Sequence, residues 1–135
     1  MNILKLYRLA FIASVAVSSF SLNAIEKTSL DIELDTAHNQ YLYGSTGKAM
    51  KSLEKIAKLI ESDPNSLPQE LRKKTLAFTY VRLGLLDERQ DNTTSANARY
   101  QKALTIINDK NVNVAKLKVV VNGIDKIAKR RHEKR

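Results

Sequence analysis

Residues 77–110, AFTYVRLGLLDERQDNTTSANARYQKALTIINDK, decide the fold of this chain. Residues 76–86 are apolar on nearly every side of a helix, which is typical of a central, buried helix. The polar run 91–94 breaks the pattern and supplies a helix cap. After this run, helical spacing returns with one apolar face, formed by Ala96, Tyr100, Ala103, Leu104 and Ile107. The stretch therefore predicts two helices joined by a short turn, the second over about 95–108.

The segment before this pair is predicted to add two more helices. Apolar residues at helical spacing favour a first helix over about 30–43, although the strict alternation of residues 30–35 would also fit a half-buried strand. A lone strand would have nothing to pair with, so we prefer the helix. Residues 44–47 form a turn signal, and the helix after it has an apolar stripe opposite a face of lysines.

The third helix and the last one carry further signals. Ser66 and Gln69 have the spacing of a capping box, which predicts that the third helix begins there and ends near Glu88. From Val112 onwards the chain keeps helical spacing through Gly123, where a kink is expected, although three consecutive valines would also suit a strand. The chain is therefore predicted to be all-α, with about five helices in antiparallel hairpins.

The N-terminus predicts export. Lys5 and Arg8 precede a short apolar run that turns polar, which is the design of a signal peptide, cleaved here after Ala24. An uncleaved membrane anchor is the alternative, but the run is shorter than the roughly 20 apolar residues of a spanning helix. We therefore expect a periplasmic or secreted protein, with residues 1–24 as the signal peptide and 25–125 as one helical domain.

Positive charge is concentrated at the C-terminus. The formal net charge is +9, and residues 126–135 hold six basic side chains against Glu133 alone. The domain before this tail is nearly balanced, which argues against a nucleic-acid surface over the whole domain. The tail is either a solvated helix end, where cations suit the helix dipole, or a site for anionic lipid or an envelope polymer. Its basic residues are Lys126, Lys129, Arg130, Arg131, Lys134 and Arg135.

The deciding stretch resembles a tetratricopeptide repeat. Six residues carry the resemblance at the spacing of that family: Tyr80, Leu83, Gly84, Ala96, Tyr100 and Ala103. The small ones would let two antiparallel helices approach closely, while the larger ones fill the space between them. Residues 33–66 resemble a second, weaker unit, separated from the first by the insertion 67–76. The last helix would then serve as the terminal cap of a short right-handed array. An unrelated antiparallel bundle is the alternative.

The resemblance implies protein binding. In this family the first helix of each unit lines a concave groove, which suits a short partner segment or a helix. The corresponding positions here are Leu34, Ala37, Tyr41, Phe78, Val81, Leu85, Glu88 and Arg89. The alternative is that the apolar ones are core, since most large apolar residues in a small chain must be buried. Two units are fewer than the three that such arrays usually need, which favours a homo-oligomer or strong capping.

Catalytic constellations are scarce in this sequence. It has no cysteine, which excludes disulfides, thiol catalysis and thiolate metal sites. His38 follows Asp35 by three residues without further metal ligands, so we interpret it as solvated. Residues 44–48 imitate a phosphate-binding loop without its spacing. We therefore expect no enzyme activity, metal or cofactor, and a protein partner rather than nucleic acid, because the tail has no interleaved aromatic residues.

Overall fold

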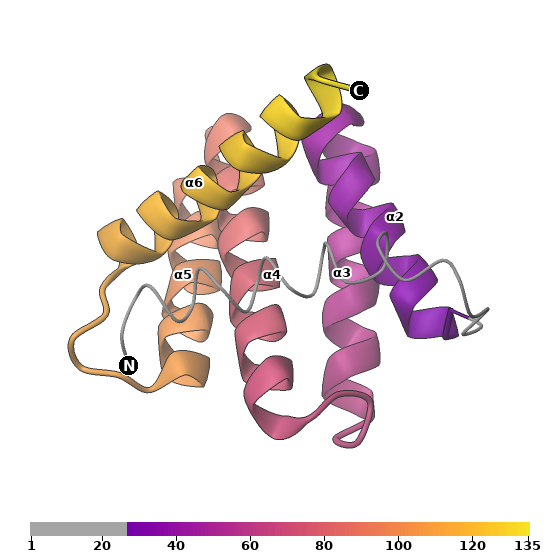
Figure 1. Cartoon of the computed structure of the whole chain (residues 1–135). Coiled ribbons are helices and arrows are strands. Elements are labelled where there is room, and N and C mark those ends of the chain that lie inside the picture. The colour runs from indigo at the N-terminus through magenta and orange to yellow at the C-terminus, as the bar shows by residue number, and fades with distance from the viewer. Residues whose placement is uncertain (1–26) are drawn as a thin grey trace.

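The computed structural model describes residues 27–135 and contains five helices in that range (Figure 1). These are α2 (Ser29–Tyr43), α3 (Thr46–Ser62), α4 (Gln69–Arg89), α5 (Thr93–Ile107) and α6 (Val114–Glu133). No strand occurs among the described residues, so the all-α prediction is confirmed and the strand alternatives near residues 30–35 and 119–121 are wrong. The predicted signal peptide, residues 1–24, lies outside the described range.

Consecutive helices pack as neighbours from α2 to α5. α2 packs on α3, α3 on α4 and α4 on α5, and the α4–α5 contact is the most extensive. α6 departs from this order (Figure 1): it starts beside α5, crosses α4 obliquely and ends beside the C-terminal end of α2. One face of the helical array is therefore covered by the last helix of the same chain.

α4 and α5 approach each other closely at Gly84. A Cβ atom built on Gly84 would lie 2.4 Å from Cε1 of Tyr100, a ring that is only 1% exposed. α4 and α5 can therefore pack this tightly only because residue 84 has no side chain. All six residues predicted to pack these helices are buried: Tyr80, Leu83, Gly84, Ala96, Tyr100 and Ala103.

Most helices begin at a polar cap residue. Ser45 accepts a hydrogen bond from the backbone N–H of Lys48 at the start of α3. Asn92 caps α5 in the same way, and Asn113 caps α6. These side chains satisfy amides of the first turn that have no partner within the helix. The cap predicted in the run 91–94 is thus confirmed.

The capping box predicted at Ser66 and Gln69 is wrong. α4 begins at Gln69, and the residue in the cap position is Pro68, which forms no side-chain cap. Ser66 belongs instead to a turn, in which its N–H donates to the carbonyl of Asp63. Its hydroxyl is buried without a hydrogen-bond partner among the described residues. Pro68 therefore moves the helix start beyond the reach of the serine side chain.

α6 is a continuous helix that includes much of the basic segment. It runs through Gly123 without a break and continues to Glu133, so residues 126–133 extend the helix rather than forming a separate coil. Its buried residues are Leu117, Val120, Val121, Ile124 and Asp125. No helix within residues 27–135 is both long and apolar enough to cross a membrane.

Candidate functional site

The strongest candidate site lies where α2, α4 and α6 meet, around Arg82. The Nη2 atom of Arg82 donates to Oδ1 of Asp125 on α6 at 2.5 Å and to Nδ1 of His38 on α2 at 3.1 Å. Its guanidinium lies over the ring of Tyr41, with Cζ 4.8 Å from the ring centroid. We call these four residues the polar hub. The hub joins three helices through one cation, and it lies on the face that α6 covers.

The charges of the polar hub are largely withdrawn from water. The side chains of Arg82 and Asp125 are 14% and 10% exposed. The Nε atom of Arg82 and the second carboxylate oxygen of Asp125 are buried with no hydrogen-bond partner among the described residues. A buried pair adds little net stability, because desolvation offsets its attraction, but removing one partner leaves a costly lone charge. The pair therefore fixes where α6 docks more than it strengthens the docking.

His38 is held in its neutral form by this arrangement. A guanidinium can only donate hydrogen bonds, so Nδ1 of His38 accepts and the ring proton lies on Nε2. Burial, together with the charge of Arg82, lowers the pKa of His38 from 6.5 to about 4, while Asp35 acts in the opposite direction. The interpretation of His38 as a solvated side chain is therefore wrong, because it is largely buried against Arg82 of α4.

The predicted groove positions divide by burial. Ala37, Tyr41 and Val81 are core residues, exposed by 3%, 6% and 0%. Three more, Leu34, Phe78 and Leu85, are partly buried and pack against the core. Glu88 and Arg89, near the C-terminal end of α4, are exposed.

In the structure, α6 lies over this face. Lys118 of α6 pairs with Glu88 of α4, which gives these two helices a second ion pair besides Arg82–Asp125. Arg89 lies over the ring of Tyr41, 5.5 Å from its centroid. The physical reason is that α6 carries an apolar stripe of its own. We call the surface formed by the predicted groove positions of α2 and α4 the α2–α4 face, and burying the stripe of α6 on it removes both surfaces from water.

The hub itself was not predicted from the sequence. Arg82 was visible as a charged residue in an otherwise apolar stretch, which is the one signal that could have marked it. Asp125 and His38 lie 43 and 44 residues away along the chain. Spacing within a helix cannot connect residues so far apart.

The basic segment is exposed at the free end of α6. All six of its predicted basic residues are exposed, and Lys126, Arg130 and Lys134 follow one another at four-residue spacing along one side. Asp125, the acidic residue beside them, turns inward to Arg82 and so leaves this side basic. His132 lies against Tyr43 of α2, with ring centroids 5.1 Å apart.

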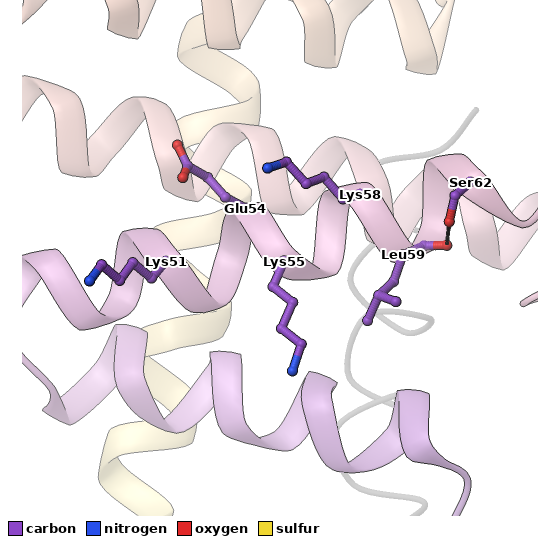
Figure 2. Close-up of a pocket in the computed structure, with 6 residues that line it drawn as sticks. All are labelled: Lys51, Glu54, Lys55, Lys58, Leu59 and Ser62. Atoms are coloured by element: carbon purple, nitrogen blue, oxygen red, sulfur yellow. Dashed lines mark hydrogen bonds between the residues drawn. The ribbon is translucent and has the colours of Figure 1, made fainter.

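A shallow, open pocket of about 460 Å³ lies on α3 (Figure 2). Lys55 reaches from it toward α2, where it pairs with Glu33, and the hydroxyl of Ser62 donates to the carbonyl of Leu59. That hydroxyl has no adjacent base in the lining, so the pocket has no arrangement for nucleophilic catalysis. The lining residues are Lys51, Glu54, Lys55, Lys58, Leu59 and Ser62.

The turn that imitates a phosphate-binding loop is a helix connection. Gly44 ends α2, and Ser45 caps α3 with its hydroxyl. Within residues 27–135, no group of three or more histidine or acidic side chains could hold a metal ion.

Comparisons with known protein families, with curated proteins and with solved structures gave no match for this chain. The resemblance to tetratricopeptide repeats therefore stays a prediction from the sequence.

Proposed function

We propose that this protein is an exported, non-enzymatic interaction module that binds a helical segment of a partner protein on its α2–α4 face. One observation supports the proposal above others: that face accommodates an amphipathic helix, since α6 lies on it in the structure. The resemblance assigns the groove to the first helices of two repeat-like units, which are α2 and α4. α6 crosses α4 and ends beside α2.

The chemistry of α6 defines the partner that would fit. Its inward side combines an apolar stripe with one carboxylate, Asp125, aimed at Arg82. A partner helix needs the same combination, because any helix that covers Arg82 without supplying a carboxylate would leave a buried cation unpaired. Binding of such a helix requires α6 to move away from Arg82.

Peptide competition tests this proposal. The full chain is immobilised, proteins from an extract of the exported fraction are captured at high salt, and a synthetic peptide of residues 114–133 is added. A groove partner should be released by this peptide. It should stay bound when the control peptide carries Asp125→Arg, which differs by one residue. The proposal would be contradicted if neither peptide released the captured proteins, or if no protein were captured.

A second candidate function is electrostatic binding of an anionic envelope component by the basic end of α6. The exposed row of Lys126, Arg130 and Lys134 favours it, because the neighbouring acidic residue is turned inward. A suitable test compares binding to vesicles containing anionic lipid before and after the six basic residues are changed to Gln. Substitution is preferable to truncation, since Ala128 packs against the core. Binding that is unaffected by the six substitutions, or by high salt, would exclude this function.

A further inference from the structure

We propose that α6 is an exchangeable helix, which leaves its own chain and docks on the α2–α4 face of a second copy of this chain, receiving that copy's α6 in return. This inference goes beyond the proposed function, because both the donor and the acceptor of the helix are this protein. The partner copy then contributes Asp125 to the polar hub.

All the contacts of α6 described above can be made between two chains. Asp125 pairs with Arg82, Lys118 pairs with Glu88, and the apolar stripe covers the face beside them. The only covalent connection is the segment 108–113 between α5 and α6. Exchange of a terminal helix conserves each of these contacts and requires no threading of the chain.

The connecting segment has the character of a hinge. Most of its residues are exposed, and Asn108 adopts a left-handed backbone with φ of 50°. This conformation is common for asparagine at the end of a helix, and it is where the chain turns away from α5 toward α6. Three hydrogen bonds among the described residues close the segment. The N–H of Val112 donates to the carbonyl of Asp109, the N–H of Asn111 to the carboxylate of Asp109, and Lys116 Nζ to the carbonyl of Asn111.

The docking of α6 is also less complete than the packing of the other helices. Arg82 Nε and the second oxygen of Asp125 lie at this interface, buried and without hydrogen-bond partners among the described residues. Buried polar atoms without partners are unfavourable for the docked state. The α4–α5 contact also buries an atom without a partner among the described residues, the hydroxyl of Tyr100, but it is the most extensive contact in the fold, whereas the contacts of α6 are the least extensive. α6 is therefore the helix whose separation from the other helices requires the least free energy.

Charge complementation between two chains tests the exchange. Arg82→Glu and Asp125→Arg are made in separate full chains, so each alone has like charges across its own interface. In an exchanged pair, the chain with Arg82→Glu receives the α6 that carries Asp125→Arg, so the two altered residues face each other. The other chain keeps its native Arg82 and receives the α6 with native Asp125. One chain is isotopically labelled, and native mass spectrometry reports the composition. We expect a 1:1 complex whose association is at least about tenfold stronger than self-association of either variant.

Two controls make the outcome decisive. The double variant Arg82→Glu/Asp125→Arg restores an opposite pair within one chain, so it should gain no partner when it is mixed with wild type. A second variant keeps the wild-type side chains but lacks residues 109–111. It tests the exchange even if the two charge variants do not fold. Its shortened hinge prevents α6 from folding back, and the chain should elute with twice its own mass in light scattering. Monomers only, in both the mixture and the deletion variant, would overturn the proposal.

Discussion

Gly84 shows how one side chain determines the distance between two helices. The Gly84→Ala substitution would place a methyl group 2.4 Å from the buried ring of Tyr100, which cannot move aside. We predict a loss of about 2 kcal/mol in the free energy of unfolding, as is usual for overpacking. Urea denaturation of the variant measures this loss.

Gly47→Ala is the matched control for that prediction. Gly47 also lies in a helix, but nothing lies within 4 Å of the position that its Cβ would take. Alanine favours the helix, so we expect a gain of up to about 1 kcal/mol. Equal effects of the two substitutions would show that α4 and α5 are not in close contact at Gly84.

His38 makes stability depend on pH. Its pKa is about 4 in the folded chain against 6.5 for a free side chain, so the unfolded chain binds more protons between these values. Stability is therefore complete above pH 6.5 and falls as the pH is lowered toward 4, by up to about 3 kcal/mol. Denaturation curves at several pH values should show this slope.

The variant His38→Gln should lack this part of the pH dependence, because glutamine offers an acceptor to Arg82 without titrating. His132→Gln is the control for replacing a histidine, since His132 lies outside the polar hub, exposed near the end of α6. Identical slopes in all three proteins would refute the role assigned to His38.

At the scale of a helix, local spacing predicted the existence of all five elements but not every start. The cap in the run 91–94 could be predicted because this polar run interrupts the apolar pattern just before helical spacing returns. Ser66 was misleading, because Pro68 shifted the helix start by more than a capping side chain can span. The surface that α6 covers could not be predicted either, since helical periodicity shows that a stripe is apolar and not which stripe it meets.

The two cap assignments can be compared directly. Asn113→Ala removes a hydrogen bond of 2.9 Å to the N–H of Lys116 at the start of α6, and should lower stability by about 1 kcal/mol. Ser66→Ala removes a buried hydroxyl without a partner, so we expect no loss or a small gain. Urea denaturation of both variants decides the matter, and a clear loss for Ser66→Ala would mean that the serine does cap α4.

At the scale of the molecule, the first prediction concerns export. If the apolar run of the N-terminus is a signal peptide, the protein recovered from its host outside the cytoplasm should begin at Ile25. Intact mass determination and N-terminal sequencing measure this directly. Recovery of the chain with residues 1–24 attached would favour the alternative of an uncleaved anchor.

The central claim concerns α6, a helix that covers the α2–α4 face and separates from it more easily than the other helices separate from one another. Native-state hydrogen exchange, followed by amide and at increasing low concentrations of denaturant, tests this claim most directly. We predict that the amides of α6 exchange through a local opening whose free energy is well below that of α4 and α5. If the amides of α6 and α4 share a single opening free energy, α6 is an integral part of the core and the claim is contradicted.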